Sequence, residues 1–150
     1  MKSMQVSRVA AASDPHLLWN TFVKLCFSGE PDPTPVQRVA QQAMLYDVEV
    51  QNGGHFQYFE NQGLAAARET VLALEQLGAR RERETLEAAI RTHERVNPHE
   101  KRVGSREEFV EGALEGHYDE FDHAYGASPL DELLKIWLNS HFDEFIEWIP

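Results

Sequence analysis

The sequence predicts an all-α protein, a single compact domain of about six helices over residues 1–150, with residues 1–13 as a flexible N-terminal segment. Three observations carry this prediction. Apolar residues repeat at helical spacing, helix start and stop signals are dense, and no stretch of any length alternates apolar and polar residues as a strand does. A chain of 150 residues, 42% hydrophobic and 26% charged, suits one folded domain.

The first expected helix has Asp14 as its N-cap and Pro15 at its first position. Its apolar side repeats at helical spacing in Leu18, Phe22, Leu25 and Cys26. Prolines in residues 31–35 end this helix, because proline cannot continue one. A second helix is expected from Thr34-Pro35 to about Val50.

Two adjacent glycines, Gly53 and Gly54, follow the second helix. Glycine tolerates the left-handed conformation that closes a helix, so we expect a corner here. Residues 55–61 then form about two helical turns, with Phe56 and Phe59 pointing into the core. A second break at residues 61–63 precedes a helix over residues 64–77, for which Gly78 is the C-cap.

Three further helices complete the expected fold. One covers residues 80–96 and stops at Asn97-Pro98. Ser105 and Glu108 form a capping box that starts a long helix from about Arg106 to Tyr125. The last helix starts at Ser128-Pro129 and continues an apolar stripe through Leu130, Leu134, Trp137, His141, Phe145 and Trp148.

The stretch EVQNGGHFQYFENQG, residues 49–63, resembles the signature of a bacterial family named for a DNA-mimic protein, most of whose members lack an assigned function. The pattern falls on Asn52, Gly53, Gly54, His55, Phe56, Gln57, Tyr58, Phe59, Asn61 and Gly63, and the similarity covers residues 35–148. The resemblance implies an all-helical fold and, in the founding member, an acidic surface that imitates DNA and occupies a transcription factor. We expect the signature itself to serve the fold, so mimicry has to be argued from surface carboxylates.

The net charge of −11 is concentrated at one end of the chain. Residues 106–150 hold two basic and twelve acidic residues, a net charge of −10. Direct nucleic-acid binding is disfavoured, because phosphate contacts need a basic surface, whereas a basic protein partner is favoured. The sequence shows no membrane span and no signal peptide, and it has a single cysteine, so a cytoplasmic protein is expected.

The expected helix from Arg106 to Tyr125 carries five carboxylates on one side: Glu108, Glu111, Glu115, Asp119 and Asp122. At about 100° per residue they share a stripe about 80° wide, with steps of about 4.5–6 Å along the axis. Phosphates along one DNA strand have a similar repeat. We therefore expect this stripe to bind a basic protein, such as a DNA-binding regulator, as a DNA mimic would. Secondary charge comes from Asp131, Glu132, Asp143, Glu144 and Glu147.

Other interpretations stay open. The acidity could serve only solubility in a structural or inhibitory partner protein, and the arginines of residues 79–95 could meet the acidic stripe of another copy in a homodimer. Glu120 and His123 form one Glu-x-x-His pair, the basis of a metal-dependent hydrolase, but a di-metal site in a helical bundle needs two such pairs. No cofactor is indicated, and catalysis is disfavoured, because Cys26 has no basic partner nearby in the sequence.

Overall fold

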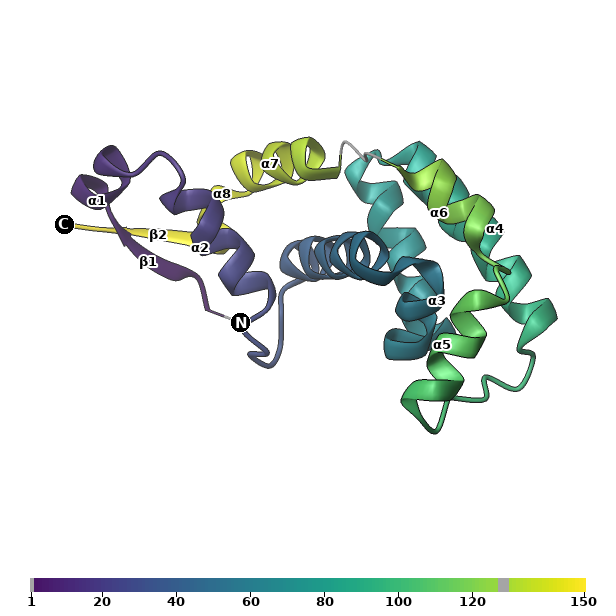
Figure 1. Cartoon of the computed structure of the whole chain (residues 1–150). Coiled ribbons are helices and arrows are strands. Elements are labelled where there is room, and N and C mark those ends of the chain that lie inside the picture. Colours follow the sequence, from purple (N-terminus) through teal and green to yellow (C-terminus); the bar gives the residue numbers. More distant parts are fainter. Residues whose placement is uncertain (1, 127–129) are drawn as a thin grey trace.

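The computed structural model describes residues 2–126 and 130–150. The described residues form eight helices and one two-stranded sheet (Figure 1). In chain order these are β1 (Met4–Ser7), α1 (Arg8–Ser13), α2 (Leu17–Cys26), α3 (Pro35–Leu77), α4 (Arg80–Val96), α5 (Arg106–Leu114), α6 (Asp119–Tyr125), α7 (Leu130–Ser140), α8 (Phe142–Phe145) and β2 (Ile146–Ile149). The fold is mostly helical, as predicted, with more helices than the expected six. The predicted helix start at Ser128-Pro129 lies outside the described residues.

α3 consists of three helical stretches joined by two corners, and the corners lie where the sequence predicted them. Backbone angles are non-helical at Gly53, Gly54 and Gly63. Gly54 and Gly63 combine a φ of 74° and 81° with an extended ψ, a region essentially open only to glycine. Asn52 and Gly53 are exposed at the first corner. Gly78 ends α3 in the left-handed conformation, as expected.

The start of α3 is fixed by a reciprocal capping box. The Thr34 side chain accepts a hydrogen bond from the Gln37 backbone N–H at 3.2 Å, and the Thr34 N–H donates to Gln37 Oε1 at 3.0 Å. Pro35 occupies the first helical turn, where its missing N–H costs nothing. The box satisfies two backbone donors at the helix terminus and accounts for the start of the second predicted helix.

The core forms around α3, which packs against α2, α4, α6 and α7. In Figure 1, α4, α5 and α6 lie around one end of α3, while α1, α2, α8 and the sheet lie at the other. The largest fully buried side chains include Phe22, Tyr46, Tyr58, Leu74, Leu86, Leu134 and Phe145. Phe59, expected in the core, is 2% exposed. Phe56, also expected there, is half-buried and packs against the core.

Residues 4–13, which fall in the segment expected to be flexible, form β1 and α1. β1 pairs in parallel with β2, from Met4 opposite Ile146 to Ser7 opposite Ile149. Val6 is buried. Each strand has only four residues, so neither offers enough alternation for sequence reasoning to detect. The sheet exists because the two ends of the chain meet.

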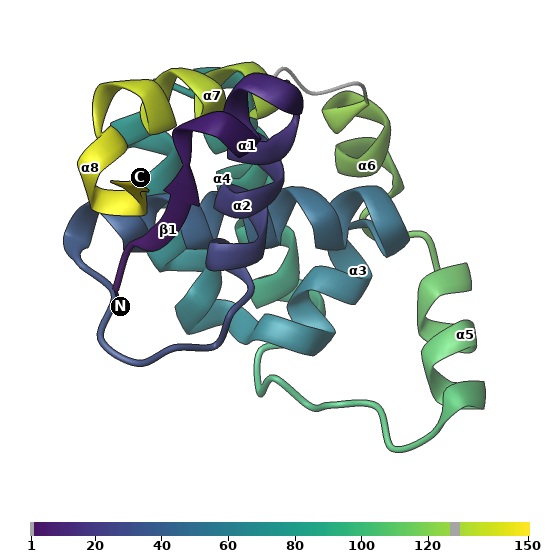
Figure 2. The same ribbon diagram turned by 90° about the vertical axis from the view of Figure 1, so that its left-hand side faces the viewer.

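Two helices expected to be continuous are broken. The helix predicted over residues 106–125 ends at Leu114, turns through Gly116 with a φ of 71°, and restarts as α6 at Asp119. The break buries Tyr118. Figure 2 shows α5 at the edge of the molecule, and α5 has no buried residue. The last predicted helix likewise ends at Ser140, and the chain continues through α8 into β2.

Candidate functional site

The five carboxylates predicted to form one stripe lie on two helices and the turn between them. Glu108 and Glu111 belong to α5, Glu115 caps its C-terminus, and Asp119 and Asp122 belong to α6. The first four are exposed, and the Asp122 side chain is 34% exposed. The single straight stripe is therefore wrong, because the turn at Gly116 gives α6 a different axis from α5.

Two of these carboxylates have local hydrogen bonds. Glu108 accepts from the Gly104 N–H at 2.7 Å through Oε2, while the Ser105 hydroxyl accepts from the Glu108 N–H at 3.1 Å. The predicted capping box therefore differs in one bond: the Glu108 side chain accepts from the Gly104 N–H and not from the Ser105 N–H. Glu115 Oε2 lies 2.9 Å from His117 Nε2. Neither carboxylate pairs with a lysine or arginine in the described part of the chain.

The remaining acids of this surface have no cationic partner. Throughout residues 2–126 and 130–150, no lysine or arginine nitrogen lies within 4.0 Å of the exposed carboxylates Glu107, Glu111, Asp119 and Glu120. We call the exposed acids of α5, α6 and their connecting turn the α5–α6 acidic surface: Glu107, Glu108, Glu111, Glu115, Asp119 and Glu120. None of these six acids forms a salt bridge with a lysine or arginine among the described residues.

The secondary acids are a mixed group. Asp131 and Asp143 are exposed. Glu132 pairs with Lys135 at 2.8 Å, and Glu144 accepts from the Thr34 hydroxyl at 2.8 Å. Glu147 accepts from Gln5 at 3.3 Å across the two strands. Of the five, Glu132, Glu144 and Glu147 thus contact other parts of the protein.

The Asp122 side chain bonds to a buried residue, His55. Its Oδ1 accepts from the backbone N–H of His55 at 2.8 Å and lies 2.6 Å from His55 Nδ1. His55 is fully buried, and its Nε2 lies 2.8 Å from the Tyr46 hydroxyl. Because an ionised carboxylate can only accept, Nδ1 carries the proton, and in the neutral imidazole Nε2 then accepts from Tyr46. A Cβ on Gly54 would overlap the Asp122 carboxylate, so the glycine corner makes room for this contact.

Other residues of the 49–63 stretch also bond within the fold. Gln57 and Asn61 donate to Glu49 Oε2 at 2.7 and 2.9 Å, which ties the short central stretch of α3 back to its first stretch. The Tyr58 hydroxyl donates to Thr70 at 2.9 Å, across the second corner. These bonds hold the three stretches of α3 together.

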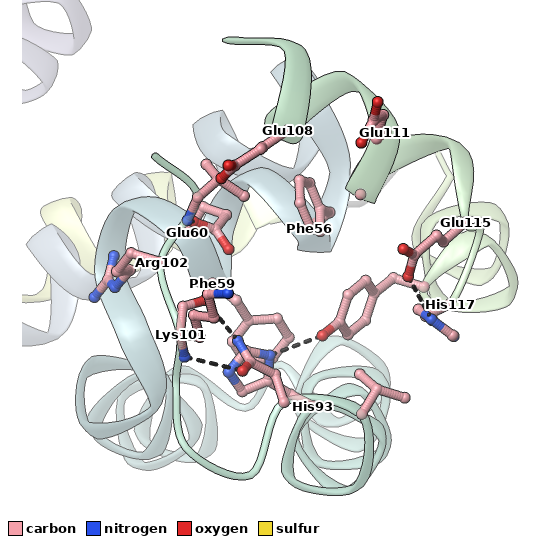
Figure 3. A pocket seen from close by; sticks show the side chains of 15 residues that line it. Phe56, Phe59, Glu60, His93, Lys101, Arg102, Glu108, Glu111, Glu115 and His117 are labelled. Atoms are coloured by element: carbon pink, nitrogen blue, oxygen red, sulfur yellow. Dashed lines mark hydrogen bonds and ion pairs between the residues drawn. The ribbon is translucent and has the colours of Figure 1, made fainter. Parts of the chain in front are cut away.

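A cavity of about 310 Å³ lies beneath α5, and the sequence did not predict it. Figure 3 shows it between α5, the middle of α3 and the end of α4, with Phe56 pointing inward. Gly112 allows α5 to approach, since a Cβ there would lie 2.5 Å from Phe56 Cζ. That glycine inside a helix was the one sequence signal of a close contact.

His93 and Tyr118 line this cavity as a buried pair. His93 is 4% exposed, stacks on Phe59 with ring centroids 4.2 Å apart, and has Nδ1 2.7 Å from the Tyr118 hydroxyl. Its Nε2 is buried without a hydrogen-bond partner among the described residues, and Glu100 Oε1 lies 3.9 Å away. Burial lowers the pKa of His93, against the opposing effect of Glu100, and raises the pKa of Tyr118 to about 12.

The residues considered for catalysis are not assembled into a site. Glu120 and His123 are both exposed on α6. Nowhere in the part of the chain that the structure describes do three His, Cys, Asp or Glu side chains gather as a metal site would require. Cys26 is buried, and burial raises the pKa of its thiol to about 12, which disfavours the nucleophilic thiolate.

Comparison with known proteins gives one match. The sequence model described as DMP19-like protein matches residues 32–141, which include all of α3 to α7. No curated protein and no solved structure matches the chain. Among the described residues, no helix has the length and apolar character to cross a membrane.

Proposed function

This chain belongs to the DMP19-like protein family, and from that premise we propose that it is a non-catalytic acidic protein that binds a basic protein surface as a DNA mimic. The partner on this proposal is a DNA-binding protein whose basic site the α5–α6 acidic surface occupies. The family resemblance supplies the idea of mimicry, and the surface carboxylates supply its physical basis.

One observation carries the proposal: α5 and α6 expose carboxylates that the protein leaves without cationic partners. Glu111 and Asp119 are exposed, and no lysine or arginine nitrogen in the described residues comes within 4.0 Å of either. By contrast, two acids of α4 are paired: Glu84 with Arg80 at 2.9 Å, and Glu94 with Arg68. Unpaired like charges attract a basic surface over the range of the Debye length and raise its rate of association.

A second feature is compatible with a binding surface. Val110 and Leu114 of α5 are 47% and 80% exposed, next to the acids. Apolar side chains are therefore available on the same helix as the carboxylates. Protein interfaces combine an apolar centre with a charged rim, which is the composition found here.

The test is competition with DNA. We expect a basic partner captured from the native cell and then purified to bind either this protein or duplex DNA, and not both together. Replacing Glu107, Glu111 and Asp119 by Gln, Gln and Asn should weaken partner binding by about 2 kcal/mol, or about 30-fold, and reduce its salt dependence. Helicity measured by circular dichroism should stay unchanged.

The matched control removes three exposed acids elsewhere: Asp14→Asn, Glu30→Gln and Glu69→Gln. It changes the net charge equally, so it separates a local surface from the charge of the whole molecule. If both triple variants weaken binding to the same extent, the surface is not specific. If the partner binds DNA and this protein simultaneously, the mimic proposal is wrong.

A further inference from the structure

We propose that the cavity beneath α5 binds the guanidinium group of an arginine side chain of the basic partner. This inference rests on the proposed function and adds which side chain the partner inserts and where. A volume of about 310 Å³ is at the lower end for small-ligand pockets, about 300–1,000 Å³, and suits one long side chain.

Carboxylates at the cavity supply the negative charge. Glu60, Glu108 and Glu115 all line it, and Figure 3 shows them around the opening. Each uses only its Oε2 in a hydrogen bond: to the Val103 N–H, to the Gly104 N–H, and with His117. No hydrogen bond involves their Oε1 atoms in the described part of the chain. A guanidinium carries five N–H donors in one plane and matches such acceptors better than a compact ammonium does.

Aromatic rings supply the second element of recognition. Tyr118 has its ring centroid 5.4 Å from that of Phe59 and 6.4 Å from that of Phe56, so three rings surround the inner part of the cavity. A guanidinium stacks on aromatic faces and is attracted by their negative electrostatic potential.

The buried imidazole of His93 supplies a free hydrogen-bonding atom. Its Nε2 is buried and has no hydrogen bond among the described residues, and an unmade bond at a buried polar atom is unfavourable. Because burial lowers the pKa of His93, the ring is neutral near pH 7. The proposal requires the tautomer in which Nδ1 donates its proton to the Tyr118 oxygen, so that Nε2 accepts a hydrogen bond from an arginine N–H.

Two cations also belong to the cavity lining and bear on its selectivity. Lys101 and Arg102 are both exposed. Figure 3 shows Arg102 extending away from the cavity, toward Gly63, where its Nη2 would lie 2.8 Å from an added Cβ. Lys101 stays in the lining beside the rings and carboxylates, and an anionic ligand is the outcome that would contradict the assignment.

The experiment compares two probes of equal charge, blocked hexa-arginine and hexa-lysine peptides, by calorimetry and by the NMR signals of His93. We expect wild type to bind the arginine peptide about 10-fold more tightly and the His93 signals to shift only with arginine. Glu60→Gln keeps an acceptor for the Val103 N–H but removes the charge, and Phe56→Leu removes a ring. Both should abolish the preference for arginine. Glu107→Gln, on exposed α5, should weaken both peptides equally.

Equal affinity of wild type for the two peptides, or a larger shift of the His93 signals with inorganic phosphate, would overturn the assignment. Phe56→Leu could lose the preference for arginine because it folds poorly. Glu60→Gln is a second test without that problem, because glutamine at this position can still accept the hydrogen bond from the Val103 N–H. The two proposals fail separately. If the α5–α6 acidic surface competes with DNA for the partner but Glu60→Gln leaves the arginine preference intact, only the cavity assignment falls. If the arginine peptide binds but no partner competes with DNA, only the mimic proposal falls.

Discussion

Asp122 joins the first corner of α3 to α6, so replacing it with alanine should destabilise the fold strongly. Asp122→Ala leaves two donors of the fully buried His55, the backbone N–H and Nδ1–H, without their acceptor. An unsatisfied buried donor costs about 1–3 kcal/mol. Since the Asp122 side chain is 34% exposed, water can reach part of the space, and we expect a loss of about 2–4 kcal/mol in the free energy of unfolding.

Asn at the same position separates the hydrogen bonds from the charge. Both bonds end on Oδ1, which asparagine retains, so Asp122→Asn should lose only the contribution of the charge, about 1 kcal/mol. Asp119→Ala is the matched control, because Asp119 lies on the same helix and is exposed. It should change stability by no more than about 0.5 kcal/mol.

Urea unfolding followed by circular dichroism and tryptophan fluorescence measures all three variants. The reasoning is refuted if Asp122→Ala is no less stable than Asp119→Ala, or if alanine and asparagine at position 122 are equally destabilising. The same variants test the partner site. Asp119→Ala should weaken partner binding, whereas Asp122→Asn, whose side chain faces His55, should leave it unchanged.

Three further predictions concern the same region. Gly112→Ala places a Cβ 2.5 Å from Phe56 Cζ. It should lower the free energy of unfolding by about 1–3 kcal/mol, measured by urea unfolding. It should also detach α5, which would be measured as faster amide exchange in that helix. Gly54→Ala combines a φ of 74° with overlap of the Asp122 carboxylate and should cost at least about 3 kcal/mol by the same measurement; an expressed variant of wild-type stability would contradict it. Burial lowers the pKa of His93 in the folded protein. In the unfolded chain, this histidine binds a proton as the pH falls below about 6.5. The folded protein binds that proton only at a lower pH. The free energy of unfolding should therefore fall between about pH 7.5 and 5.5, and His93→Gln should reduce that fall when unfolding is measured at both pH values.

Sequence reasoning located the elements whose cause is local. The corners at Gly53–Gly54 and Gly63, and the C-cap Gly78, follow from backbone conformations that glycine alone adopts readily. The start of α3 follows from Thr34 and the proline after it. Each of these signals is complete within a few residues, so no tertiary information is needed to interpret it.

The errors have a common physical cause, which is contact between distant segments. The helix of residues 106–125 has a continuous apolar side, but burial of Tyr118 against His93 and Phe59 favours a turn at Gly116. The two strands exist only as a pair separated by about the whole chain, Met4 opposite Ile146. The cavity likewise requires α5 to pack on α3, which periodicity along one helix cannot reveal.

Asp119 and Asp122 show why helical periodicity could not assign the acids to fold or function. They are three residues apart on α6 and look equivalent on a helical wheel, yet Asp119 is exposed and Asp122 is bonded to a fully buried histidine. What separates them is the position of His55, fixed by the corner at Gly54. The side chains of His55, Gln57 and Asn61 near that corner are hydrogen-bonded within the fold. On the proposed function, recognition then falls to the exposed carboxylates of α5 and α6, which have no lysine or arginine partner among the described residues, and to the unbonded nitrogen of His93.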